Sequence, residues 1–90
     1  MKNFTNKVAV ITGAGSGMGR YLSVLLAKAG ANVAICEINP TTLAETEAML
    51  KDYSVKVTSH IIDVADKAAI DALPAQVIEL HGHVDMVFNN

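Results

Sequence analysis

Cysteine, tryptophan and proline are scarce in this sequence of 90 residues, which has one cysteine, no tryptophan and two prolines. The lone Cys36 excludes an internal disulfide framework, which fits a reducing compartment, and we expect its side chain in the core. Long apolar runs are also missing, because none approaches the roughly 18–20 residues of a membrane-spanning helix. These absences exclude a disulfide-stapled domain and a helical membrane span within the 90 residues.

The sequence also lacks a strong excess of either charge, since seven basic and nine acidic residues leave a net charge of −2. The basic residues are scattered and form no stripe that could hold nucleic acid or an anionic membrane, so we expect neither partner. The apolar fraction of 51% is typical of a packed globular chain. The N-terminal segment is polar and shows no export signal, which predicts a cytoplasmic location.

Short apolar runs alternate with amphipathic segments along the whole chain. The runs are typical of strands buried in a parallel sheet and cover residues 7–12, 31–36, 55–62 and 84–88. The segments between them are predicted to be helices. This order, β-α-β-α-β-α-β, predicts a doubly wound parallel α/β sheet with right-handed crossovers and the strand order 3-2-1-4.

The first predicted helix carries an apolar stripe that we expect to face the sheet, and Gly30 is placed to end it. The stripe contains Met18, Tyr21, Leu22, Leu25, Leu26 and Ala29. The second helix is expected to begin with Asn39 as its N-cap and Pro40 at its first position, and to run to about Asp52.

The third predicted helix has Asp66 as its cap, reaches Gly82 and contains Pro74. An interior proline costs about 3 kcal/mol in a helix because it lacks the N–H donor and clashes with the preceding turn. Two interpretations follow: either the helix bends at Pro74, or a short turn precedes a helix that starts near Pro74.

A glycine-rich segment, Thr12-Gly-Ala-Gly-Ser-Gly-Met-Gly19, lies between the first strand and the first helix. Its glycines, Gly13, Gly15, Gly17 and Gly19, stand at alternate positions. Without Cβ atoms the backbone can turn sharply and a pyrophosphate can approach closely. The N–H groups and the positive dipole end of the following helix then bind the phosphates. The segment predicts a dinucleotide site.

Glu37 follows the second strand, 18 residues beyond Gly19. A carboxylate at this place can accept both ribose hydroxyls of the adenosine half and would repel a 2′-phosphate. Neither Ile38 and Asn39 nor Ser16 in the glycine loop is basic, so nothing there would bind that phosphate. The sequence therefore predicts NAD as the cofactor in preference to NADP.

Asp63 and Val64 come directly after the third strand, where carboxyl ends of strands line the ligand crevice of such sheets. Asp63 could accept the adenine amino group, and Val64 could pack on the ring. A helix-capping or loop aspartate is an equally good interpretation of Asp63.

Two of these segments together resemble the short-chain dehydrogenase/reductase family. The glycine-rich segment matches the family pattern TGxxxGxG, although Met18 stands where isoleucine is common. Val84-Asp-Met-Val-Phe-Asn-Asn90 resembles the family's fourth strand, which runs into Asn-Asn-Ala-Gly. The resemblance spans essentially the whole chain.

The resemblance implies a Rossmann fold and hydride transfer between a nicotinamide ring and an alcohol or carbonyl. It implies that the cofactor lies along Gly13, Ser16, Gly17 and Met18. It places Glu37 on the ribose, Asp63 and Val64 at the adenine, and Asn90 near the adenosine ribose.

The family's catalytic residues have no counterpart in this sequence. The family uses a Tyr-x-x-x-Lys pair, an upstream serine and a further asparagine, all beyond the fourth strand. Here Tyr21 and Tyr53 are followed four residues later by Leu25 and Val57. Residues 1–90 are therefore expected to form a single NAD-binding half-domain that is incomplete relative to the family domain. We expect it to be inactive alone, and it does not contain the residues that would select the substrate.

Other functions stay open at this point. One is a non-catalytic nucleotide-binding or interaction module. Another is an S-adenosylmethionine-dependent methyltransferase, which the glycines and Glu37 would suit, although Gly19 and the Thr-Gly and Asn-Asn segments argue against it. His81 and His83 flank Gly82 without a third ligand at a suitable spacing, so no metal site is predicted.

The fourth predicted strand is expected to lie at an open edge of the sheet. Its N–H and C=O groups would be unpaired and its apolar side chains bare, which favours pairing with another chain. Asp85 is the only charge in the strand that opposes such pairing. We therefore expect a homo-oligomer or self-association through this strand.

Overall fold

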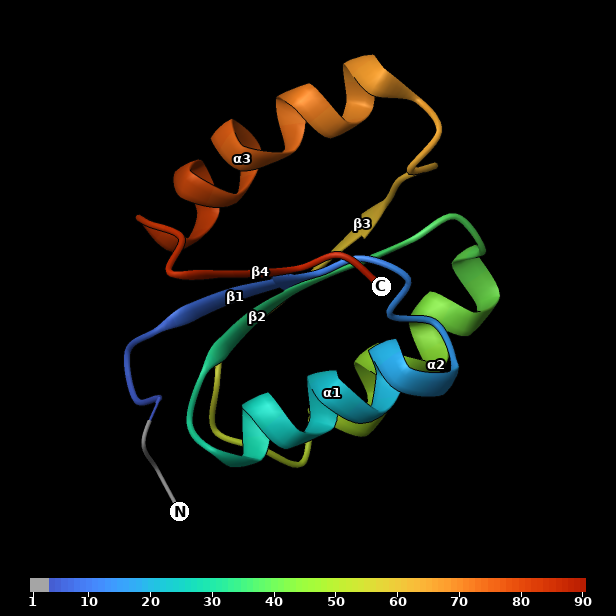
Figure 1. Cartoon of the computed structure of the whole chain (residues 1–90). Helices are drawn as coiled ribbons and strands as arrows, with labels where there is room; N and C mark the ends of the chain where they lie inside the picture. The colour runs from blue at the N-terminus through green and yellow to red at the C-terminus, as the bar shows by residue number, and fades with distance from the viewer. Residues whose placement is uncertain (1–3) are drawn as a thin grey trace.

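A computed structural model describes residues 4–90, and strands and helices alternate along it as predicted (Figure 1). The elements are β1 (Val8–Ile11), α1 (Gly17–Lys28), β2 (Asn32–Glu37), α2 (Pro40–Leu50), β3 (Val57–Ile61), α3 (Lys67–His81) and β4 (Met86–Phe88). The predicted number, type and order of elements are all confirmed, while several ends differ by one or two residues.

The sheet is parallel throughout and has the strand order β3-β2-β1-β4, which confirms the predicted 3-2-1-4 order. β1 lies in the middle, where Val10 is in register with Ala34 of β2 and Val87 of β4. All carboxyl ends of the strands therefore meet at one edge of the sheet, which is where the glycine-rich loop begins.

Helices cover both faces of the sheet, with α1 and α2 on one face and α3 on the other (Figure 1). Side chains of β1 alternate between two clusters because successive residues of a strand point to opposite faces. Ala9 and Ile11 lie in the cluster with α1 and α2, whereas Val8 and Val10 lie in the cluster with α3. This burial on both faces explains why β1 is continuously apolar in sequence.

Local signals set the helix ends much as predicted. The Asn39 side chain accepts hydrogen bonds from the N–H groups of Thr41 and Thr42, at 2.9 and 3.3 Å, with Pro40 at the first position of α2. The Asp66 side chain accepts from the Ala69 N–H and caps α3. α2 ends at Leu50, two residues before the expected end at about Asp52.

The predicted core-facing stripe of α1 is wrong for three of its six residues. Met18, Tyr21 and Leu25 are 71%, 61% and 43% exposed, respectively. Leu26 of the stripe is buried as predicted, together with Gly19, Ser23 and Ala27, which the stripe did not include. The glycine decides this rotation, because a Cβ on Gly19 would lie 2.1 Å from the Gly13 carbonyl oxygen, so no larger residue fits that face.

α3 continues through Pro74 as one helix, so the interpretation in which a helix starts near Pro74 is wrong. On its buried side, Leu73 and Val77 stand four residues apart and pack against the sheet. Burial of these two side chains offsets the local cost of the proline, which leaves the Ile70 carbonyl without its helical N–H partner.

β4 is shorter than predicted, because it begins at Met86 and excludes Val84 and Asp85. The Asp85 carboxylate accepts a hydrogen bond from the Val8 N–H at 2.8 Å, and the Asp85 N–H donates to the Val8 carbonyl. Asp85 thus holds the start of β1 and does not place its charge along the edge of β4, contrary to the expectation.

Candidate functional site

The glycine-rich loop runs from the end of β1 into α1 and bends through two left-handed residues. Gly13 has φ +64° and Gly17 has φ +55°, a region that favours glycine. A Cβ on Gly17 would meet nothing within 4 Å, so the backbone there is open to a ligand. Ser16 is the N-cap of α1 but makes no side-chain capping hydrogen bond, so no side-chain cap covers the first turn.

Gly15 makes room for Glu37. A Cβ on Gly15 would lie 2.4 Å from the Thr42 Oγ1 and 2.6 Å from the Glu37 Cγ. The Gly15 N–H donates to the Glu37 Oε1 at 2.9 Å. The absence of a Cβ on Gly15 therefore allows the Glu37 side chain to lie directly against the loop.

The Glu37 carboxylate is held at the end of β2 by two backbone donors. Besides the Gly15 N–H on Oε1, the Asn39 N–H donates to Oε2 at 3.3 Å. Charge-assisted bonds of this kind fix the orientation of a carboxylate. Glu37 thus presents a positioned negative charge beside the glycine-rich loop.

Asn90 lies against the same loop, at the end of the segment after β4. Its N–H donates to the Thr12 Oγ1 at 3.1 Å. A Cβ on Gly13 would be 3.1 Å from the Asn90 carbonyl oxygen, and one on Gly19 would be 2.7 Å from the Asn90 Nδ2. Gly13 and Gly19 therefore allow the loop, α1 and the β4 end to meet.

A small cavity of about 90 Å³ brings together predicted residues from all four strand ends. It is lined by Gly13, Glu37, Ile38, Ile62, Asp63, Val64 and Asn90. Sequence reasoning missed Ile38 and Ile62. In the sequence, Ile38 directly follows Glu37, and this position beside the carboxylate was the available signal. In the structure its side chain is 56% exposed.

Asp63 has a part in the local turn as well as in the cavity. Its Oδ1 accepts from the Ala65 N–H at 2.9 Å, and its carbonyl accepts from the Asp66 N–H at 2.9 Å. Val64, the next residue, is 60% exposed. The loop role that the sequence left open for Asp63 is thus present, and it coexists with a place in the cavity wall.

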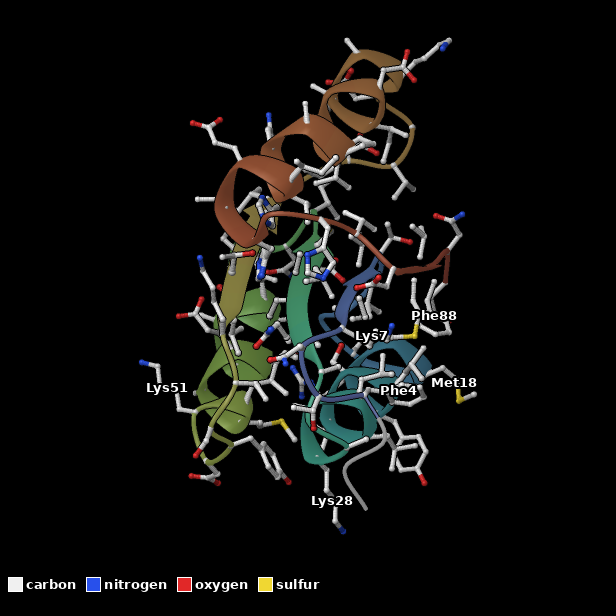
Figure 2. The ribbon with its side chains drawn as sticks, turned by 90° about the vertical axis from the view of Figure 1, so that its left-hand side faces the viewer. Phe4, Lys7, Met18, Lys28, Lys51 and Phe88 are labelled. Carbon is white, nitrogen blue, oxygen red and sulfur yellow. The ribbon has the colours of Figure 1, made fainter. Side chains whose placement is uncertain are left out.

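The remaining predicted residues of the loop lie at the surface. Ser16 is exposed, and the Met18 side chain projects outward from α1 (Figure 2). Met18 does not line the 90 Å³ cavity, which lies at Gly13 and Glu37.

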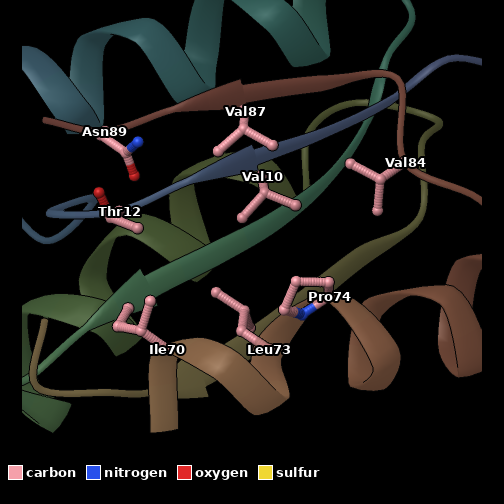
Figure 3. Close-up of a pocket in the computed structure, with 8 residues that line it drawn as sticks. All are labelled: Val10, Thr12, Ile70, Leu73, Pro74, Val84, Val87 and Asn89. Carbon is pink, nitrogen blue, oxygen red and sulfur yellow. The ribbon is translucent and has the colours of Figure 1, made fainter. Parts of the chain in front are cut away.

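A second, larger cavity of about 210 Å³ lies on the face of the sheet that α3 covers, between α3 and the β1–β4 pair (Figure 3). Its lining comprises Val10, Thr12, Ile70, Leu73, Pro74, Val84, Val87 and Asn89. Most of this lining is apolar, with the two polar side chains, Thr12 and Asn89, together at one end. None of the predicted cofactor-binding residues contributes to it.

Three further side chains that could take part in chemistry, one cysteine and two histidines, have structural roles. Burial raises the pKa of the Cys36 thiol to about 12, so it is neutral and unreactive near pH 7, as expected of a core cysteine. The Nε2 of His81 lies 2.8 Å from the Thr58 Oγ1, whereas the Nε2 of His83 lies 2.9 Å from the Asp85 Oδ2. Residues 4–90 contain no group of three or more potential metal ligands.

A parallel sheet with a glycine-rich loop and a carboxylate at its carboxyl edge defines a Rossmann-type α/β protein. Residues 7–90 match the short chain dehydrogenase family, and the chain belongs to that family. The resemblance seen in the sequence is thereby confirmed, and the methyltransferase interpretation is not supported. Within residues 4–90 no helix has the length and apolar character needed to cross a membrane.

Curated relatives share this part of their sequence with the chain. The short chain dehydrogenase/reductase astE of Aspergillus oryzae is 41% identical over 85 residues, which are 93% of this chain and 33% of astE. Levodione reductase of Leifsonia aquatica is 34% identical over 89 residues, which are 97% of this chain and 33% of that enzyme. The chain thus spans about a third of the length of these relatives.

Solved structures confirm the fold. NAD⁺-bound xylitol dehydrogenase superposes with a TM-score of 0.95 at 31% identity, over 99% of this chain and 34% of that one. Carveol dehydrogenase from Mycobacterium avium in complex with NAD gives 0.89 at 29% identity, over 97% and 36%. A metagenomic short-chain oxidoreductase in complex with NADP gives 0.86 at 28% identity, over 93% and 38%.

Proposed function

We propose that this chain is the cofactor-binding part of an NAD-dependent oxidoreductase that transfers hydride between a nicotinamide ring and an alcohol or carbonyl. The observation that carries the proposal is the Glu37 carboxylate, held against the glycine-rich loop by the Gly15 N–H. Family membership and neighbours named for NAD or NADP complexes support a dinucleotide.

Each predicted residue has a role in this proposal. The pyrophosphate lies over the open backbone of Gly13, Ser16 and Gly17 and beside Met18, where N–H groups of the first turn of α1 face it. Gly15 and Gly19 act through their missing Cβ atoms, which would collide with Glu37 and Gly13, respectively.

The adenosine half of the cofactor is assigned to the 90 Å³ cavity. Glu37 accepts hydrogen bonds from the ribose hydroxyls, and Asn90 lies near that ribose. Asp63 and Val64 contact the adenine, with Ile38 and Ile62 supplying further apolar surface.

The preference for NAD over NADP rests on charge. A 2′-phosphate would bring negative charge beside Glu37, which two backbone N–H groups hold in place. The NADP complex would also lose the ribose 2′-hydroxyl as a donor. We expect NAD to bind at least about tenfold more tightly, since loss of hydrogen bonds to a charged group alone is worth that much.

Calorimetric titration of the chain with NAD, NADP and S-adenosylmethionine tests the proposal. NAD should bind best and S-adenosylmethionine should give no heat. Glu37→Gln is the matched control: it keeps the shape of the side chain but removes its charge, so the penalty against NADP should shrink. Equal affinities of the unaltered chain for NAD and NADP would refute the role of Glu37.

We also propose that the 90 residues supply cofactor binding without the acid/base pair of the reaction. Neither Tyr21 nor Tyr53 has a lysine four residues later, so no tyrosine has the family's partner. The chain should reduce no NAD with a panel of alcohols, followed by absorbance. Sustained turnover by the verified chain would contradict this, and would equally contradict a non-catalytic binding module.

Self-association through β4 is the remaining part of the proposal. β4 is at the edge of the sheet, and its central residue Val87 is 58% exposed. Because Asp85 is bound to the Val8 N–H, no charge lies within β4 to oppose pairing with a second copy.

A further inference from the structure

Arg20, in the first turns of α1, reaches across to α2 and back to the glycine-rich loop. Its side chain is 26% exposed, and its Nε and Nη2 lie within hydrogen-bonding distance, 2.5–3.1 Å, of four acceptors. The acceptors are the Gly15 carbonyl, the Thr42 carbonyl, the Glu45 carboxylate and the Thr46 Oγ1. No sequence pattern singles out Arg20, because three of its four partners lie on α2, 22 to 26 residues away.

Thr46 carries the same network to the neighbouring peptide. This fully buried residue accepts from the Arg20 Nε at 2.9 Å and donates its hydroxyl to the Ala14 carbonyl at 2.8 Å. The carbonyls of Ala14 and Gly15 are therefore both bound from the α2 side, one by Thr46 and one by Arg20.

Because a peptide group is planar, a contact that holds its carbonyl also sets the direction of the N–H in the same peptide. In a trans peptide the C=O and the following N–H point in opposite directions. The Ala14 carbonyl shares its peptide with the Gly15 N–H, which donates to Glu37. The Gly15 carbonyl shares its peptide with the Ser16 N–H, which therefore points away from α2.

We propose that Arg20, acting with Thr46, is a positioning residue for cofactor binding. Arg20 fixes the peptide after Gly15 directly, and it fixes the peptide before Gly15 through Thr46, whose hydroxyl it holds. One N–H thereby orients Glu37 and the next faces the phosphates. This inference rests on the proposed function, because it names what prepares the same site.

The Glu45 carboxylate beside Arg20 argues against direct binding of a phosphate, because it already pairs with the guanidinium charge. The Arg20 Nη2 is committed to the loop carbonyl and to α2, and the Glu45 carboxylate at 3.0 Å balances its charge. The guanidinium holds Thr46 and Gly15 from two separate nitrogens of one rigid plane, whereas an ammonium would have to reach both from a single atom. Geometry, rather than charge, therefore distinguishes Arg20 from lysine at this position.

The test compares Arg20→Met and Arg20→Lys with Val77→Ala, a core substitution on the opposite face of the sheet. Dissociation constants for NAD and NADP are measured by calorimetry. Exchange of the Gly15 amide hydrogen is measured by NMR without ligand and is expressed relative to the Val10 amide, which corrects for changes in global stability.

Both Arg20 variants should weaken NAD binding by about tenfold and lower the NAD-to-NADP preference at least about threefold. The Gly15 amide should exchange about tenfold faster relative to Val10, because Glu37 no longer holds it. Val77→Ala should leave the preference and the relative exchange unchanged, even where it costs more stability.

Arg20→Met would overturn the inference if it kept the wild-type affinity for NAD and the wild-type preference for NAD over NADP. Full NAD affinity in Arg20→Lys would also overturn it, because it would indicate that only the charge of Arg20 matters. If the unaltered chain bound neither dinucleotide, the proposed function would fail. The exchange rate of the Gly15 amide would then still show whether Arg20 positions the glycine-rich loop. Faster exchange in Arg20→Met supports that role of Arg20, and unchanged exchange overturns it.

Discussion

Single residues of the glycine-rich loop have distinct physical tasks. Gly17 combines positive φ with open space, whereas Gly15 and Gly19 are constrained by what a Cβ would strike. The neighbours of Gly15 are side-chain atoms of Glu37 and Thr42, which can move. The neighbour of Gly19 is the backbone carbonyl of Gly13, which cannot move without distorting the loop.

This difference predicts an order of stability. Gly19→Ala should lower the free energy of unfolding by about 3 kcal/mol or more, and Gly15→Ala by about 1–2 kcal/mol, because overpacking against backbone relaxes least. Ser16→Ala, at an exposed N-cap without a capping bond, is the control and should change it by less than about 0.5 kcal/mol. Urea unfolding measures all three, and a larger loss for Gly15→Ala would contradict the orientation of α1.

At the scale of elements, α3 is the helix in which local propensity and tertiary packing conflict, because Pro74 lies inside it. Pro74 removes one N–H from the helix, yet Leu73 and Val77 hold the element on the sheet. Tertiary packing of an amphipathic face commonly outweighs local propensity in this way.

Pro74→Ala should therefore raise the free energy of unfolding by about 1–2 kcal/mol. The gain is smaller than the roughly 3 kcal/mol helix cost of proline, because proline also restricts the unfolded chain. Ala75→Gly, at the exposed neighbouring position, should lower the free energy by about 1 kcal/mol. Thermal unfolding gives both values, and destabilisation by Pro74→Ala would show that the ring's contacts in the 210 Å³ cavity matter more than the helix.

At the scale of the whole molecule, a polar contact joins the outer strand β3 to the end of α3. The Thr58 Oγ1 lies 2.9 Å from the His60 Nε2 and 2.8 Å from the His81 Nε2. Burial lowers the pKa of both histidines below 6.5, and for His81 the nearby Lys56, His60 and His83 lower the pKa further. Both rings are thus neutral in the folded chain near pH 7.

These shifts predict loss of stability in mild acid. Because the folded pKa values are lowered, the unfolded chain binds more protons once the pH falls below about 6.5. The free energy of unfolding should be steady above that pH and decline below it. Urea unfolding between pH 8 and pH 5.5 tests this, and His81→Gln should flatten the decline. A profile that rises toward acid would contradict the assignment.

The open edge at β4 is the other property of the whole molecule. Val87→Lys should weaken association, because it places a charge at the centre of an edge strand that has none. Val87→Thr, which keeps a β-branched side chain without charge, is the control and should retain more association. Light scattering over a range of concentrations measures this, and a well-folded monomer of the unaltered chain at high concentration would argue against the β4 interface.

The sequence by itself determined the order of elements, the parallel topology and the family. Those features depend on local periodicity, on caps such as Asn39 and Asp66, and on a glycine motif whose spacing is read directly from the chain. Glu37 and Asp63 could also be named, since both directly follow predicted strands.

Only the tertiary structure decided which face of α1 is buried and what each glycine accommodates. Gly19 faces Gly13 because of a contact across the loop, and no helical periodicity encodes that contact. The Arg20 network and the placement of Asp85 at Val8 likewise join residues far apart in sequence, up to 77 positions. Such contacts arise from how the sheet brings its strands and helices together, so a local pattern of residues does not reveal them.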